Sequence, residues 1–247
     1  MKVSTLISRA VTLAQLLENP KRMKLYRMGG MVPVYAALDA AWFHRLHIRT
    51  VLDIGSNAGG CTLSMAELLP SATIYAFEPL EDIYQLLCRN VAPYAGRIKT
   101  FNVALGEMEE VQEFLRYGCA GSSSFLKPSS SFQTDDPNAA QTKKLIVKTR
   151  RLDDVAAELA LETPIFVKMD VQGFEDRVLR GGRVTLAKAS VIMIESSFLP
   201  QYQNQAMFDD IYKTLTAWGF RYFGSIDIQL NKEGLPAWED ALFIKQQ

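Results

Sequence analysis

Several charged side chains in this chain stand at the ends of strand-like runs, where they can meet a bound ligand. Residues 50–60 read as a buried strand, a glycine-rich turn and the start of a helix, an arrangement that lets backbone approach a nucleotide-like ligand closely. Glu78 ends the next strand-like run, about 20 residues beyond the turn, where an acidic residue holds the two hydroxyls of a ribose. We therefore expect an adenosine-containing cofactor.

The side chains of the glycine-rich turn indicate which cofactor it takes. A dinucleotide site needs the pattern Gly-x-Gly-x-x-Gly, but Asn57 stands where the second glycine belongs and would crowd a pyrophosphate. Asn tolerates a positive φ better than most residues, so the turn itself survives. Asp53 brings negative charge, which disfavours phosphates and favours the sulfonium and ammonium groups of S-adenosylmethionine. The expected cofactor-binding residues of this region are Asp53, Gly55, Ser56, Asn57, Gly59 and Glu78.

A second group of charges surrounds the end of the predicted fourth strand. Asp170 lies at its carboxyl end, where ligands of open α/β sheets bind, and Lys168 shares its face of the strand. Glu195 ends the adjacent predicted strand, so the three charges should cluster as a catalytic base with a supporting ion pair. The alternative is a structural salt-bridge network that closes the end of the sheet, because a buried Lys168 needs a partner.

Some of these residues also have structural explanations, which stay open at this point. Gly59 and Gly60 would suit close packing between helix and strand, and Glu78 could be an ordinary solvated carboxylate. Glu175 falls in the first turn of the following helix, where an acid complements the helix dipole.

The residue types that hold metals or act as nucleophiles form no recognisable site elsewhere. His44 and His47 precede the first strand and fall on no strand end. Asp170 with Glu195 supplies too few ligands for a metal ion, so no metal is expected. The chain has three cysteines, Cys61, Cys88 and Cys119. They are widely separated and lack Cys-x-x-Cys spacing, which argues against a disulfide framework or zinc site and fits the cytoplasm.

The order of strand-like and helical segments indicates how these residues are brought together. Strands are expected at 50–54, 73–77, 98–102, 164–169 and 191–195, with helices near 60–69, 80–92, 152–160 and 174–181. Such alternation predicts an α/β fold with a Rossmann-like, doubly wound and mostly parallel sheet. After a helix near 207–218, strands near 220–225 and 241–245 with a turn at 231–234 should pair antiparallel at the sheet edge.

Two segments stand apart from this alternation. Residues 1–48 are mainly helical and are expected to cap the Rossmann-like domain of residues 49–247 rather than to fold alone. Apolar residues at helical spacing between Leu6 and Leu17 predict an amphipathic helix that packs on the domain or on a second subunit, so a homodimer is possible. Residues 118–142 are rich in turn formers and predict a functional lid or a disordered segment, carried by a strand pair at 111–117 and 144–150.

Composition narrows the choice of partners. The chain has 247 residues, 48% of them hydrophobic, enough for one sizeable core. Its formal net charge of zero gives no reason to expect nucleic acid or an anionic membrane as a partner. No apolar run approaches the roughly 18 residues that a membrane span requires, and we read no signal peptide. A cytoplasmic location is therefore expected.

Further motifs identify a family. The segment Lys168-Met-Asp-Val-Gln-Gly-Phe-Glu175, followed by Val178-Leu-Arg-Gly181, resembles the signature of the FkbM-type methyltransferases. Other blocks match the family's pattern in order, at residues 53–59, 77–79, 102–106, 151–154 and 194–196. The resemblance covers roughly residues 48–245 and implies a class I methyltransferase domain that uses S-adenosylmethionine. Such enzymes typically O-methylate a hydroxyl of a sugar or natural product, so the implied partner is a small hydroxylated acceptor.

The resemblance also implies roles for individual residues. Asp53, Gly55 and Asn57 would line the methionine end of the cofactor, and Glu78 would hold the ribose. Asn102 would lie near the adenine, and Asp170 would sit beside the transferring methyl group and contact the cofactor. Relatives often carry an acidic residue at the position of Gln172, so Asp170 has one carboxylate neighbour fewer here.

Two other functions remain to be weighed. An NAD-dependent oxidoreductase on the same sheet is disfavoured by Asn57 and Asp53 and by the lack of a Tyr-x-x-x-Lys pair. A binding module that keeps the fold but has lost chemistry is disfavoured because Asp170, Lys168 and Glu195 occur together.

Overall fold

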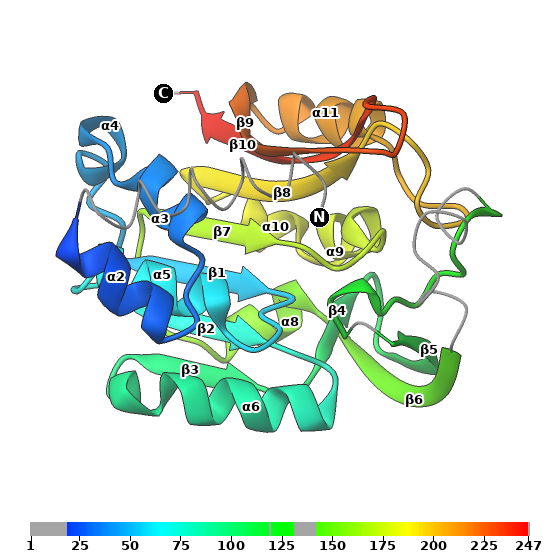
Figure 1. The fold of residues 1–247 in the computed structure, drawn as a ribbon, viewed down its shortest axis with the longest axis horizontal. Coiled ribbons are helices and arrows are strands. Elements are labelled where there is room, and N and C mark those ends of the chain that lie inside the picture. Colours follow the sequence, from blue (N-terminus) through cyan, green and yellow to red (C-terminus); the bar gives the residue numbers. More distant parts are fainter. Residues whose placement is uncertain (1–18, 119, 131–141, 247) are drawn as a thin grey trace.

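The structure is a computed structural model that describes residues 19–118, 120–130 and 142–246. Its main sheet has seven strands in the order β3-β2-β1-β7-β8-β10-β9. The strands are β1 (Thr50–Ile54), β2 (Thr73–Phe77), β3 (Ile98–Phe101), β7 (Ile165–Met169), β8 (Val191–Ser197), β9 (Phe220–Leu230) and β10 (Pro236–Lys245). Figure 1 shows them stacked from β3 at the bottom to β9 at the top.

All the pairs of this sheet are parallel apart from those that β10 makes. β1 pairs in parallel with β2 and β7, and β7 with β8, whereas β10 runs antiparallel to both β8 and β9. The expected doubly wound sheet with an antiparallel hairpin at its edge is confirmed. The reversed strand itself lies one place in from the edge, because β10 inserts beside β8. Strand order reverses between β1 and β7, and this switch point opens the crevice where such sheets bind ligands.

Helices cover both faces of the sheet, which is why its central strands are buried along their length. The helices are α5 (Gly60–Leu68), α6 (Glu81–Val91), α8 (Leu152–Ala157), α9 (Glu175–Gly181), α10 (Arg183–Leu186) and α11 (Phe208–Ala217). Every residue of β1, β7 and β8 is buried. Val51 joins a core cluster with Leu63 of α5, whereas its neighbour Leu52 joins a second cluster with Leu179 of α9. Adjacent strand residues point to opposite faces, so both faces need apolar residues.

Short helices precede the sheet: α2 (Pro20–Arg27), α3 (Val32–Leu38) and α4 (Ala41–His44). Leu25, Leu38 and Phe43 are buried in the same core cluster as α5. The predicted helix between Leu6 and Leu17 lies outside the described residues, so the cap as a whole stays a prediction. In the described part of the chain, no helix is long and apolar enough to cross a membrane.

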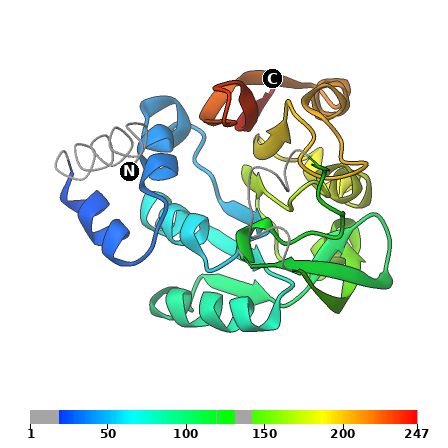
Figure 2. The same cartoon turned by 45° about the vertical axis from the view of Figure 1, so that its right-hand side comes forward.

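A second sheet of three strands is inserted after β3, in the order β4-β6-β5. Its strands are β4 (Ala104–Gly106), β5 (Glu110–Tyr117) and β6 (Thr142–Arg151). The antiparallel pairing of β5 with β6 confirms the predicted strand pair, whereas the three-residue β4 was not predicted. In Figures 1 and 2 this sheet lies beyond the carboxyl ends of β1 and β7. Of the predicted lid or disordered segment, residues 119 and 131–141 lie outside the described residues.

Gly181 explains how the second sheet can lie so close to α9. A Cβ atom added at Gly181 would lie 1.9 Å from the carbonyl oxygen of Gly106 at the end of β4. The contact is with backbone, so it cannot be relieved by turning a side chain. Any larger residue must therefore push α9 and β4 apart.

We expect Gly181→Ala to lower the free energy of unfolding by about 1–3 kcal/mol, because the added methyl group overpacks this contact. Denaturation in urea measures the change. Gly96→Ala is the matched control, since a Cβ there meets no atom within 4 Å. Equal midpoints for the two variants would contradict the close approach of α9 and β4.

Candidate active site

A pocket lies at the carboxyl ends of β1, β2 and β7 and is walled by the second sheet. It encloses about 650 Å³, a volume that includes space open to solvent. Its apolar lining comes from the strand ends and loops and from Val103, Leu105, Phe114, Phe125 and Phe174. Among its lining residues, the charged side chains are Glu78 and Asp170, both acidic. The pocket therefore favours a ligand that carries positive charge.

The turn after β1 takes the conformation that the glycine pattern predicted. Gly55 and Asn57, which both line the pocket, have φ of +78° and +49°. A Cβ at Gly55 would lie 1.9 Å from the carbonyl oxygen of Asp170, so this glycine is required for the turn to meet β7. Gly59 is the N-cap residue of α5 with φ of +91°, and a Cβ there would lie 2.8 Å from Leu87 of α6. Gly59 thus serves packing between two helices, whereas the sequence left open packing between helix and strand, and its contact with a cofactor stays a prediction.

Glu78 is held in place by backbone. Its side chain is buried, with Oε2 accepting the N–H of Asn57 at 3.0 Å and Oε1 accepting the N–H of Leu80 at 2.8 Å. Burial raises the pKa of Glu78 to about 7, although these two hydrogen bonds act in the opposite direction. It is therefore not a solvated loop carboxylate. Each oxygen keeps a lone pair that can accept from a ligand hydroxyl.

Ser56 and Asn102 lie next to the pocket and hydrogen-bond to backbone near its lining residues. Ser56 is buried and donates its hydroxyl to the carbonyl of Asp53 at 2.7 Å. Asn102 donates Nδ2 to the carbonyl groups of Glu78 and Pro79, at 3.0 and 3.1 Å. Neither side chain is part of the pocket lining. Both fix the backbone that carries Asn57 and Glu78, and direct contact with a cofactor stays a prediction for them.

Lys168 is a buried cation at the junction of β1 and β7. Its Nζ donates to the carbonyl of Gly55 at 2.7 Å and lies 3.5 Å from Asp170 Oδ2 and 3.7 Å from Asp53 Oδ1. Burial alone would lower the pKa of Lys168, but the charges of Asp170 and Asp53 raise it above its ordinary value. Lys168 is therefore held protonated and cannot act as a base.

Asp53 lies behind Lys168 rather than in the pocket. Its side chain is completely buried, Oδ2 accepts the hydroxyl of Thr62, and it does not line the pocket. Parallel pairing of β1 with β7 sets Asp53 directly beside Lys168. The carboxylate of Asp53 contacts Lys168 and Thr62, and its contact with the methionine end of a cofactor stays a prediction. Asp53 acts on the pocket through Lys168.

Asp170 and Glu195 form a pair of carboxyl groups bridged by an amide. Gln172 Nε2 donates to Asp170 Oδ1 at 2.7 Å and to Glu195 Oε2 at 2.8 Å. Burial alone would raise the pKa of Asp170, but Lys168 and a hydrogen bond from Glu195 hold it below its ordinary value. Burial and the charge of Asp170 raise the pKa of Glu195 well above its ordinary value. Asp170 is therefore the ionised member and Glu195 the protonated one.

The structure thus brings together Asp170, Lys168 and Glu195, as their strand positions predicted. Their catalytic role stays a prediction. Glu175 accepts the N–H of Val171 at 2.9 Å, and burial raises its pKa to about 7, so it holds the turn after β7 at the start of α9. This fits the structural explanation that the sequence left open.

Some residues near this cluster were not singled out for the site. Asp240 of β10 lies directly opposite Glu195, and burial and the charge of Asp170 raise its pKa to about 7. Gln172 was noted only as a departure from relatives, although it lines the pocket and bridges the carboxyl pair. No sequence motif marks Asp240, because its place depends on the register of β10 against β8.

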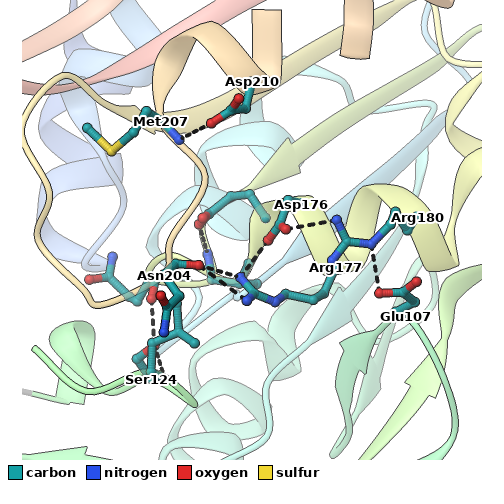
Figure 3. A network of polar contacts seen from close by, with 12 residues as sticks. Glu107, Ser124, Asp176, Arg177, Arg180, Asn204, Met207 and Asp210 are labelled. Atoms are coloured by element: carbon teal, nitrogen blue, oxygen red, sulfur yellow. Dashed lines mark hydrogen bonds and ion pairs between the residues drawn. The ribbon is translucent and has the colours of Figure 1, made fainter. Parts of the chain in front are cut away.

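Two arginines of α9 contact the segments that surround the pocket, namely the second sheet and the loop after β8 (Figure 3). Arg180 donates Nε to Glu107, just after β4, at 2.7 Å. Arg177 lies between Asp176 and the carbonyl of Asn204 and packs over the ring of Phe174, 5.2 Å from its centre. Phe174 in turn packs on Phe125, with ring centres 4.7 Å apart. These contacts join the second sheet and the loop after β8 to one rim of the pocket.

The histidines and cysteines lie away from this cluster. His44 contacts Asp39 at 2.9 Å, and neither histidine lines the pocket. Cys61 is buried, Cys88 is half-buried, and both are free thiols. Cys119 lies outside the described residues. In the described part of the chain, no group of three or more metal-ligating side chains is positioned to hold an ion.

Comparisons with known proteins agree with this geometry. A model of the family described as the methyltransferase FkbM domain matches residues 53–222. The chain is similar to the 2-O-methyltransferase NoeI of Sinorhizobium fredii, with 30% identity over 161 residues that cover 63% of this chain and 66% of that protein. It is 26% identical to the hexuronic acid methyltransferase AglP of Haloferax volcanii over 147 residues, 58% of this chain and 54% of that protein. The chain thus spans two thirds or less of the length of these relatives.

A solved structure has a similar arrangement of elements. The magnesium protoporphyrin IX methyltransferase ChlM of Synechocystis PCC 6803, with bound SAM, gives a TM-score of 0.46 at 13% identity. The match covers 87% of this chain and 81% of that one.

The raised pKa of Glu78 makes a prediction about stability. Below its ordinary pKa of 4.5 the carboxyl is protonated in both the folded and unfolded states, whereas between pH 4.5 and about 7 only the unfolded state ionises. Stability contributed at this position is therefore lost as the pH rises through that window. The free energy of unfolding of Glu78→Gln, taken relative to that of the parent, should rise by about 2–3 kcal/mol between pH 4.5 and 7.5. Urea unfolding at several pH values measures it.

Glu233→Gln, at an exposed position between β9 and β10, is the control and should change the free energy of unfolding by less than about 0.5 kcal/mol throughout. A difference between Glu78→Gln and the parent that stays constant with pH would show that Glu78 is already ionised in the folded state.

Proposed function

Because the chain belongs to the methyltransferase FkbM domain family, we propose that it transfers the methyl group of S-adenosylmethionine to a hydroxyl oxygen of a sugar or glycosylated acceptor. The predicted family resemblance is thereby confirmed. The cofactor, the acceptor and the oxygen as the methylated atom are our inferences from the site.

The observation that carries the proposal is the charge of the pocket. Glu78 and Asp170 are its charged lining residues, and they lie on either side of the glycine turn after β1. S-adenosylmethionine carries a sulfonium and an ammonium, whereas the pyrophosphate of NAD would meet two carboxylates. Glu78, already held by two backbone N–H groups, is positioned to accept from the ribose hydroxyls. The sulfonium would then face Asp170.

The chemistry asks little of the protein beyond alignment. The acceptor oxygen attacks the methyl carbon in line with the carbon–sulfur bond, and the electrons of that bond pass to sulfur. The products are S-adenosylhomocysteine and a methyl ether. Asp170, held ionised by Lys168, accepts a hydrogen bond from the attacking hydroxyl and takes its proton as the new bond forms. Glu195, as the protonated partner, donates to Asp170 and fixes its orientation.

The relatives support the class of acceptor. NoeI is named a 2-O-methyltransferase and AglP a hexuronic acid methyltransferase. An oxidoreductase conflicts with membership of a methyltransferase family, so that alternative is dropped. A binding module without chemistry is distinguished from the enzyme by the second experiment below.

Glu78→Ala should weaken the binding of S-adenosylmethionine about 10- to 100-fold, because hydrogen bonds to a charged group are lost. Isothermal titration calorimetry measures the dissociation constant, with NADH as the competing ligand class. Glu81→Ala removes an exposed carboxylate nearby and should leave affinity unchanged within about threefold. Heat from NADH but none from S-adenosylmethionine would refute the proposed cofactor.

Asp170→Asn should keep the cofactor bound but reduce methyl transfer about 100-fold or more, since the proton acceptor is lost. The assay follows methyl-labelled S-adenosylmethionine into a panel of monosaccharide glycosides and a cell extract. Asp209→Asn, an exposed change in α11, is the control. A parent protein that binds the cofactor yet labels nothing would indicate a non-catalytic module.

A further inference from the structure

Gln172 connects the carboxyl pair to the segment that covers it, which we define as residues 120–130. Its φ is +56°, a conformation that few non-glycine residues adopt, and Gly173 follows at +89°. This tight turn after β7 brings the side-chain amide back to Asp170 and Glu195, at 2.7 and 2.8 Å. A carboxylate in this position could not donate to both groups, so the amide is specific to the task.

Tyr202 links the same side chain to the covering segment. It is buried, with 1% exposure, in the loop after β8. Its hydroxyl oxygen lies 2.8 Å from Gln172 Oε1 and 2.8 Å from the carbonyl oxygen of Ser122. A phenol carries one proton, so the two acceptors share it. The hydroxyl therefore responds to the position of both partners.

Ser124 makes a second link, to the backbone of Gln172. Its hydroxyl donates to the Gln172 carbonyl at 2.6 Å, and its side chain is completely buried. Ser124 also exchanges backbone hydrogen bonds with Leu115 of β5, at 2.8 and 3.0 Å. The covering segment, which supplies Gly121, Ser123 and Phe125 to the pocket lining, is thus attached to Gln172 in two ways.

We propose that Gln172 is a positioning residue that, through Tyr202 and Ser124, ties the orientation of the Asp170 carboxylate to the seating of the covering segment. The inference rests on the proposed function, because it takes Asp170 to face the sulfonium of the cofactor. Displacing the segment breaks its hydrogen bonds to Tyr202 and Gln172, and the amide is then free to turn away from Asp170. Asp170 is held in its reactive orientation only when the pocket is covered, which keeps methyl transfer away from water.

A double-mutant cycle on the affinity for S-adenosylmethionine tests this coupling by calorimetry. Tyr202→Phe removes the shared hydroxyl and should weaken binding about 3- to 10-fold. In an Asp170→Asn background the same change should have no further effect, because the group that it positions is gone. Tyr117→Phe is the matched control: Tyr117 also contacts the segment, donating to the Leu126 carbonyl at 3.4 Å. The factor by which Tyr117→Phe lowers the affinity for S-adenosylmethionine should be the same in the parent and in the Asp170→Asn background.

Suppose that the parent binds S-adenosylmethionine and that the double variant loses affinity by the product of the factors for Tyr202→Phe and Asp170→Asn. This result would overturn the coupling and leave the proposed function intact. If the parent does not bind S-adenosylmethionine, the proposed function fails. Hydrogen exchange on the free protein then tests the link from Gln172 through Tyr202 to the covering segment. Tyr202→Phe should then speed exchange of the Ser124 amide, which donates to Leu115, because the hydrogen bond from Tyr202 to the Ser122 carbonyl is lost. Exchange as slow as in the parent would show that Tyr202 does not hold the segment and would overturn the link.

Discussion

The buried ammonium of Lys168 is the contact on which the site depends. A charge can be buried in a protein only when other groups replace its water, and Lys168 has the Gly55 carbonyl and the carboxylates of Asp53 and Asp170. These partners come from the turn after β1, from β1 itself and from the end of β7. One cation therefore fixes the glycine turn against the neighbouring strand and keeps Asp170 ionised.

The two carboxyl groups of the pocket, Glu78 and Asp170, differ in their partners and in the direction of their pKa shifts. Glu78 is held by backbone N–H groups and has a pKa raised by burial, so its charge is easily gained or lost near neutral pH. Asp170 faces a cation and stays ionised. A bound sulfonium or ammonium adds positive charge near both groups, and this favours the ionised form of Glu78. Binding of a cationic ligand and ionisation of Glu78 thus support each other.

The second sheet gives the fold its pocket. The main sheet alone presents an open crevice at its switch point, and the β4–β6 insertion closes one side with Leu105 and Phe114. The ion pair from Arg180 to Glu107 and the close approach of Gly181 to Gly106 hold this wall against α9. The insertion therefore shapes one side of the pocket, whereas the main sheet supplies the strand ends and the glycine turn on the other.

The sequence by itself determined the order of the elements and the strand ends that carry Asp53, Glu78, Asp170 and Glu195. Continuous apolar runs, turn glycines and terminal acids are local signals, and β1 and β2 span the residues expected from them. Tertiary structure alone decided which of these acids face the pocket. Strand pairing set Asp53 beside Lys168 and outside the pocket lining, and the register of β10 set Asp240 opposite Glu195. A contact across strands depends on register and burial, which no local pattern records, and for the same reason Gln172 and Tyr202 were not expected to meet.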